Sequence, residues 1–244
     1  MTKVAKGRAV FHAQSAVSGP GGSARAFKAP IRLQTSFVSA RERVLLDELC
    51  RRAPAWITPD RLTAIGSAGA AITALGYIGT RWSPTFLVVA SLGLVLNWLG
   101  DSLDGSLARH RRIERARFGY FLDHSIDALN ILVIAVGLGL TPYVNLAAAL
   151  MMLAGYYLLT IHVLLSAQVI GEFPLTKAYL GPTELRIITI AFNCAILAIG
   201  PLNLRLAGYD VSIWSALVVF EAVVFIALFA IAVFATARRL ARDL

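Results

Sequence analysis

Four aspartates flank an arginine-rich stretch inside an otherwise apolar chain: Asp101, Asp104, Asp123 and Asp127. Carboxylates near a membrane interior are costly to desolvate, so their presence there points to a function. If the four converge, mutual repulsion and poor solvation would drive some of them to protonate unless cations neutralise them. Carboxylate-only ligands suit Mg²⁺ or Mn²⁺, and two such ions about 3.5–4 Å apart would stabilise an in-line displacement at phosphorus.

The first aspartate pair has helical spacing. At about 100° per residue, Asp101, Asp104 and Ala108 fall within an arc of about 60°, and Gly105 and Arg109 widen that face to about 140°. The two small residues leave room for a flat or phosphorylated ligand to approach the backbone. The planar guanidinium of Arg109 is suited to binding phosphate.

The second pair lies on another stripe, because Gly119, Asp123 and Asp127 follow one another in steps of four. The connection 110–116 is short, so the two helices should be antiparallel neighbours whose carboxylates converge near their cytoplasmic ends. An alternative interpretation pairs the aspartates with arginines of the turn, but it does not explain the small residues on the same face. Those arginines are Arg111, Arg112, Arg115 and Arg117.

The elements that must position these aspartates are membrane-spanning helices. Residues are 57% hydrophobic and the mean hydropathy is +0.69, which indicates an all-α, polytopic membrane protein and excludes a soluble domain. Six apolar segments are each long enough to cross about 30 Å of hydrocarbon. They cover residues 62–80, 84–108, 117–140, 144–169, 184–204 and 211–237.

The distribution of basic residues predicts the orientation. With six spans, every Lys and Arg except Arg81 and Arg205 falls on the side that holds both termini. Cytoplasmic loops carry the excess of Lys and Arg. We therefore expect a bacterial inner-membrane protein with both termini and the aspartates on the cytoplasmic side.

Two segments precede the spans in the domain division that we predict. Residues 1–38 contain no acidic residue and should form a disordered basic arm attracted to anionic lipid headgroups, with a transit peptide as the rival interpretation. Residues 39–56 should form an amphipathic interfacial helix that begins with a capping box of Ser39 and Glu42, unless this helix docks on the loops instead. Residues 57–244 would be the six-helix catalytic domain.

The aspartate stretch also resembles a known signature. The segments "DSLDGSLAR" and "GYFLDHSID" fit D-x-x-D-G-x-x-A-R…G-x-x-x-D-x-x-x-D, which is similar to the motif of the CDP-alcohol phosphotransferases (CDP-alcohol phosphatidyltransferases). These are integral membrane enzymes of phospholipid synthesis. The gap between Arg109 and Gly119 is one residue longer than we expect, which affects the loop but not the helical spacings. The resemblance extends over about residues 39–240.

The resemblance implies roles for all eight motif residues. Asp101, Asp104, Asp123 and Asp127 would hold two Mg²⁺ or Mn²⁺ ions, and Asp127 would also be the general base. Gly105, Ala108, Arg109 and Gly119 would bind the CDP moiety.

The resemblance also implies a reaction. A substituted phosphate passes from a CDP-linked donor to an alcohol hydroxyl, and CMP leaves. In the first scheme the donor is CDP-diacylglycerol, and the group transferred is phosphatidyl. In the alternative scheme the donor is CDP-choline or CDP-ethanolamine, and the acceptor is a lipid alcohol. The partners expected are this donor, the acceptor and the bilayer, with no nucleic acid. Because family members often dimerise, a homodimer is also expected, although the sequence identifies no dimer face.

Three further residues are candidate contacts for the acceptor or a phosphate. His124 lies between two motif aspartates in "LDHSID", a stretch similar to the choline/ethanolamine branch of the family. Arg186 could reach a phosphate in the cavity or could only anchor its helix by snorkelling. Lys177 belongs to the segment 170–182, which is a candidate lining of the acceptor site.

Two functions of other classes compete with this reading. An aspartate-rich membrane prenyltransferase also holds a diphosphate through Mg²⁺, but its two motifs are expected on well-separated helices. A cation carrier would use the aspartates as an ion path, but it does not predict Gly105 and Ala108 beside Arg109.

Overall fold

The computed structural model describes residues 31–32, 39–170, 172–173, 181–206 and 209–242. Most of the predicted basic arm 1–38 lies outside these residues, as do Lys177 and most of the segment 170–182. Seven helices occur in the described part of the chain, and six are long and apolar enough to cross a membrane, which confirms the predicted fold class. The helices are α1 (Ser39–Arg52), α2 (Pro59–Gly79), α3 (Phe86–His110), α4 (Ala116–Gly139), α5 (Leu146–Ile170), α6 (Pro182–Ile199) and α7 (Ile213–Leu240).

The short strands are an addition that the apolar pattern did not predict. The strands β1 (Ile31–Arg32) and β2 (Glu172–Phe173) pair in parallel, and β3 (Asn203–Leu206) and β4 (Tyr209–Ser212) form an antiparallel hairpin. The predicted fifth span, 184–204, is therefore wrong at its end. Helix α6 stops at Ile199 because Gly200 adopts a φ of +80° and Pro201 follows, and proline has no N–H to continue the helix.

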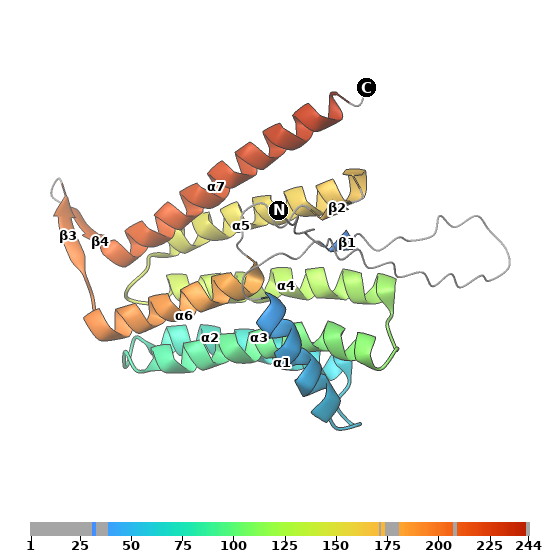
Figure 1. Cartoon of the computed structure of the whole chain (residues 1–244). Coiled ribbons are helices and arrows are strands. Elements are labelled where there is room, and N and C mark those ends of the chain that lie inside the picture. The colour runs from blue at the N-terminus through green and yellow to red at the C-terminus, as the bar shows by residue number, and fades with distance from the viewer. Residues whose placement is uncertain (1–30, 33–38, 171, 174–180, 207–208, 243–244) are drawn as a thin grey trace, which may run out of the picture.

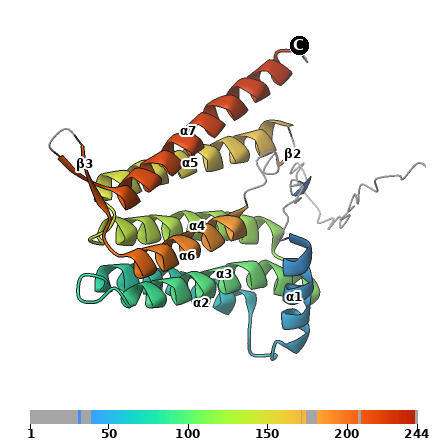
Figure 2. The same ribbon diagram turned by 60° about the vertical axis from the view of Figure 1, so that its left-hand side comes forward.

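The helices form a layered bundle (Figure 1). Helices α2 and α3 lie at one side, α4 and α6 lie in the middle, and α5 with α7 forms the opposite side, as the turned view also shows (Figure 2). Helix α1 lies across the end of the bundle that carries the α3–α4 turn, whereas the β3–β4 hairpin lies at the other end. The second half of α7 diverges from the bundle.

The pair α2–α3 packs with backbone against backbone. A Cβ added to Gly69 would lie 2.4 Å from the Asn97 nitrogen, and one added to Gly100 would lie 2.4 Å from the Gly66 nitrogen. No larger residue fits such a close approach without moving a helix. This contact fixes the start of α2 beside the end of α3, where the first aspartate pair lies.

Two apolar clusters hold the other helices. One joins α2, α3, α4, α6 and α7 through the buried side chains of Tyr77, Leu87, Leu138, Ile196 and Trp214. The second places α1 on α2 and α3, because Leu46 and Cys50 pack against Leu62, Leu103 and Leu107. The end of the bundle that carries the aspartates is thus packed against a helix outside the six spans.

Candidate active site

The turn between α3 and α4 is fixed by contacts of its arginines with the α1–α2 connection. Arg111 donates to the carbonyl oxygens of Ala53 at 3.0 Å, Pro54 at 2.9 Å and Ile57 at 2.5 Å. Arg115 forms an ion pair with Asp60, on the first turn of α2. These two arginines therefore stabilise the position of the turn, and their contacts do not favour the alternative in which they neutralise the four aspartates.

The structure brings the two aspartate pairs to one pocket. Asp101 of α3 and Asp123 and Asp127 of α4 each offer a carboxylate oxygen, and these atoms all lie within 4.8 Å of one another. The three residues are half-buried. The pocket is lined by Thr63, Gly66, Asp101, Asp104, Asp123, Ile126, Asp127 and Asn130.

Asp104 lines the same pocket but has partners of its own. Its Oδ2 accepts a hydrogen bond from Thr63 Oγ1 at 2.6 Å, and its Oδ1 accepts one from the Gly105 backbone N–H at 2.5 Å. Sequence reasoning missed Thr63. Its only signal is its place in "ITPDRLT", where it falls one turn into α2 on the side that faces α3.

Arg186 of α6 reaches the aspartates directly. Its Nη2 donates to Asp101 Oδ2 at 2.9 Å, and its Nε donates to Asn97 Oδ1 at 3.0 Å. Asn97 is buried and donates in turn to the Gly66 carbonyl oxygen at 3.0 Å. Sequence reasoning also missed Asn97, although it lies one helical turn before Asp101 on the same face of α3.

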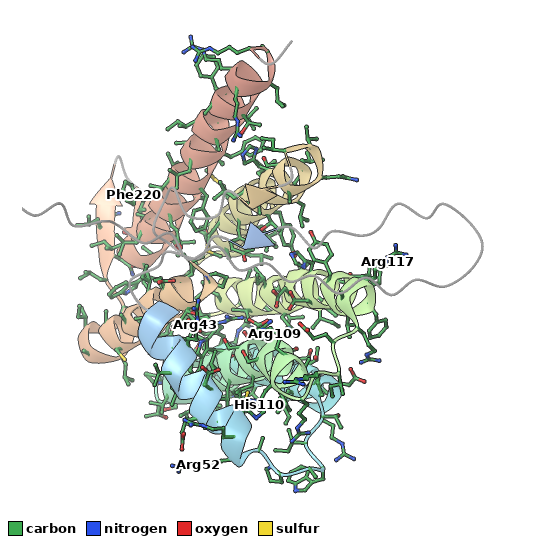
Figure 3. All side chains as sticks on the ribbon, turned by 45° about the vertical axis from the view of Figure 1, so that its right-hand side comes forward. Arg43, Arg52, Arg109, His110, Arg117 and Phe220 are labelled. Atoms are coloured by element: carbon green, nitrogen blue, oxygen red, sulfur yellow. The ribbon has the colours of Figure 1, made fainter. Side chains whose placement is uncertain are left out.

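The four residues predicted to bind the CDP moiety lie nearer the turn and do not line this pocket. Arg109 is exposed and donates to Ser106 Oγ at 3.1 Å; it is labelled in Figure 3, which looks onto the end of the bundle with the turn. A Cβ on Gly105 would lie 3.4 Å from Arg109 Nη1, and one on Gly119 would meet nothing within 4 Å. With Ala108 these residues form a rim between the pocket and the turn, in which Arg109 and Gly119 are exposed and Gly105 and Ala108 are half-buried.

His124 lies beside the pocket without lining it. Its Nδ1 is 3.0 Å from the Tyr120 carbonyl oxygen and 3.5 Å from Asp123 Oδ2. Its ring centroid is 4.3 Å from that of Tyr120. The imidazole is therefore packed against its own helix, at a distance from Asp123 that suits an electrostatic contact.

The donor set fits a hard divalent cation. Three carboxylates from two helices present oxygen atoms close together, and Asp104 adds a fourth to the pocket. Oxygen-only sets of this kind are those of Mg²⁺, Mn²⁺ and Ca²⁺, not of Zn²⁺. Arg186 brings one positive charge into direct contact with Asp101, one of these carboxylates. Further cationic charge would therefore be stabilised here.

Comparisons with known proteins agree with this geometry. The family model described as CDP-alcohol phosphatidyltransferase matches residues 53–237, a range that contains every residue lining the pocket. The chain is also similar to the "Inner membrane protein YnjF" of Escherichia coli (strain K12), with 45% identity over 73 residues. That match covers 30% of this chain and 32% of the relative, so it spans about a third of the curated protein.

Proposed function

The chain belongs to the CDP-alcohol phosphatidyltransferase family, whose members transfer substituted phosphate groups, and on this premise we propose that it transfers the phosphatidyl group of CDP-diacylglycerol to an alcohol hydroxyl with release of CMP. It is an integral membrane protein with six apolar helices long enough to span a bilayer. The donor is a lipid, so it reaches the pocket from within the bilayer. The alcohol reaches it from the aqueous side.

The observation that carries this proposal is the approach of Asp101, Asp123 and Asp127, whose oxygen atoms lie within 4.8 Å of one another. A diphosphate bears charge that the four carboxylates alone would repel. The pocket can bind it only if cations lie between the two, and the donor set fits them. A cation site in the pocket is therefore what a diphosphate substrate requires, and this supports the proposal.

In the proposed mechanism the four aspartates hold the metal ions and Arg186 contributes a fixed positive charge. Two Mg²⁺ or Mn²⁺ ions, when bound, would neutralise the negative charge of the diphosphate. Arg186 stays oriented through Asn97 and Asp101, so its remaining donors can contact a phosphate oxygen. The rim at Gly105, Ala108, Arg109 and Gly119 would accept the cytidine diphosphate.

Asp127 is the proposed general base. It accepts the proton of the acceptor hydroxyl as that oxygen attacks the phosphorus distal to cytidine. A new oxygen–phosphorus bond forms and the bond from this phosphorus to the bridging oxygen breaks, so CMP leaves with the electron pair. The residues contribute mainly positioning and charge neutralisation.

We propose the inner membrane of a bacterium as the location, with the pocket facing the cytoplasm. The E. coli relative is named as an inner membrane protein. The arginines around the α3–α4 turn mark this end of the bundle as cytoplasmic by the positive-inside rule.

A second scheme uses the same pocket with CDP-choline or CDP-ethanolamine as donor and a lipid alcohol as acceptor. The likeness of "LDHSID", the stretch that contains His124, to the choline/ethanolamine branch of the family is the observation that keeps it open. A screen of the purified protein decides between the two, pairing CDP-diacylglycerol with small alcohols and CDP-choline or CDP-ethanolamine with diacylglycerol. CMP from the first set alone supports our proposal, CMP from the second set alone contradicts it, and CMP from neither excludes both schemes.

A further inference from the structure

Glu42, near the start of α1, lies at a junction of three helices. Its Oε1 accepts hydrogen bonds from Trp98 Nε1 at 2.8 Å and Ser102 Oγ at 3.3 Å, both on α3, and from Thr183 Oγ1 at 2.9 Å, on α6. Hydrogen bonds to an ionised carboxylate are stronger than those between neutral groups. One side chain outside the six spans therefore ties the first turn of α6 to α3.

These donors lie close in the sequence either to Arg186 or to the residues that it contacts. Trp98 follows Asn97, Ser102 follows Asp101, and Thr183 lies one helical turn before Arg186. The contacts of Glu42 and those of Arg186 thus join the same two helices, α3 and α6, within about one helical turn of each other. Holding Thr183 against α3 limits how far the next turn of α6, which carries Arg186, can move away.

We propose that Glu42 is a positioning residue that fixes the first turn of α6 against α3 and thereby holds the Arg186 guanidinium on Asp101 and Asn97. The inference rests on the proposed function for its effect on turnover, because that function gives Asp101 and Arg186 their roles. Glu42 itself does not line the pocket. It acts through the helices that do.

The contacts of Arg186 tolerate little displacement of its helix. Its two contacts are 2.9 Å and 3.0 Å long, and N–H···O hydrogen bonds in proteins span only about 2.7–3.2 Å. A displacement of about 1 Å in a catalytic group can cost about a hundredfold in rate. Within α6 the carboxylate of Glu184 accepts from the Gly181 backbone N–H at 2.9 Å, which caps the helix but gives it no tie to α3.

A distance measurement tests the positioning without any substrate. Spin labels at Val95→Cys on α3 and Ile188→Cys on α6, both exposed sites, report the separation of the two helices in a Cys194→Ser background. We expect a narrow distance distribution that broadens in Glu42→Leu and, to a smaller extent, in Thr183→Val. Glu42→Gln keeps an acceptor oxygen and should stay narrow. Glu48→Gln is the matched control, because Glu48 pairs only with Arg51 and Arg52 of its own helix among the contacts that the structure describes.

Turnover supplies the second readout. Glu42→Leu should lower kcat/KM about tenfold, and Glu42→Gln should restore it to within about threefold of the unmodified protein. In the Arg186→Ala variant, adding Glu42→Leu should lower kcat/KM by less than about twofold. The contact that Glu42 supports is already missing there, so the two effects should not add. Effects that multiply would overturn the inference, since Glu42 would then act independently of Arg186.

Unchanged distances in both Glu42→Leu and Thr183→Val would also overturn it. If Glu42→Leu fails to fold, Thr183→Val decides, because it removes one hydroxyl donor and keeps the shape of the side chain. If every form fails to release CMP while the distances respond as expected, the proposed function fails and the positioning role stands. The two failures are therefore distinguishable.

Discussion

Arg186 and Asp101 form an ion pair between α6 and α3, with 2.9 Å between Nη2 and Oδ2. The side chains are only 15% and 21% exposed, so solvent screens the pair far less than it screens a surface salt bridge. The pair joins residues that are 85 positions apart in the sequence. It makes Arg186 a cation that the fold itself supplies to the aspartate pocket.

Removing the guanidinium should weaken substrate binding. We expect Arg186→Ala to raise the KM for the CDP-linked donor about 10- to 100-fold, the range that corresponds to losing hydrogen bonds from a charged group. The KM of Arg186→Lys should lie between those of Arg186→Ala and the unmodified protein. A lysine ammonium keeps the charge, but it cannot contact Asn97 and Asp101 with the geometry of the planar guanidinium. Steady-state kinetics measure this, with Arg238→Ala on the exposed end of α7 as control. Unchanged KM values for both substrates would assign Arg186 to anchoring its helix.

Replacing the proposed base should stop turnover without unfolding the protein. Asp127→Asn keeps the size of the side chain but cannot accept the hydroxyl proton, so CMP release should fall at least about 100-fold. Thermal unfolding in detergent checks that the fold persists. Asp60→Asn is the control, since Asp60 pairs with Arg115 outside the pocket. A rate for Asp127→Asn near that of the unmodified protein would remove Asp127 as base.

Two glycines of this region should respond in opposite ways. Gly100→Ala places a Cβ 2.4 Å from the backbone of Gly66, so it should lower the free energy of unfolding by about 1–3 kcal/mol or more. Gly119→Ala meets nothing within 4 Å and should leave stability unchanged or raise it slightly. If Gly119 belongs to the CDP-binding rim, Gly119→Ala should lower kcat/KM while the stability of the protein stays the same. Equal loss of stability in both would contradict the packing described for α2 and α3.

Arg111 should matter for stability more than for chemistry. Its three carbonyl acceptors fix the α1–α2 connection against the turn, so Arg111→Ala should cost about 1.5–3 kcal/mol of unfolding free energy. Arg112→Ala, at the exposed neighbouring position, is the control and should cost much less. If Arg111→Ala instead changed Mn²⁺ affinity at unchanged stability, the interpretation that pairs this arginine with the aspartates would be favoured.

The sequence predicts the arrangement of the aspartates because that arrangement depends on local periodicity. Asp101 and Asp104 share one face of a helix, Asp123 and Asp127 share another, and a short turn forces the helices to be neighbours. Each of these inferences uses residues close together in the chain. The approximate starts and ends of most spans follow from apolar length.

Contacts between distant segments could not be predicted in the same way. Glu42 fits a local capping box with Ser39, yet its Oε1 is engaged by Trp98, Ser102 and Thr183. Likewise Thr183, a residue type that often caps helices, donates to Glu42, whereas Gly181 occupies the cap position of α6. Short motifs favour local partners, and only the packing of the helices shows which distant donors approach.

The end of the fifth span shows a different limit. Residues 200–204 are apolar enough to extend a helix, but Gly200 and Pro201 stop it and the chain enters the β3–β4 hairpin. Apolar composition alone does not distinguish the end of a span from a short strand. Arg109 was placed on the aspartate face by its angle, but it lies in the last turn of α3, where its long side chain extends to Ser106.

The central claim is that this protein releases CMP from a CDP-linked donor by metal-dependent transfer. The most direct measurement is CMP release by the purified protein from CDP-diacylglycerol and an alcohol, with Mg²⁺ or Mn²⁺, after chelation, and after the metal is restored. We predict that CMP is released with metal, that chelation stops its release, and that restoring the metal restores it. Asp123→Asn should release no CMP in any of these conditions. CMP release that persists in the chelator, or that survives the loss of Asp123, would contradict the account.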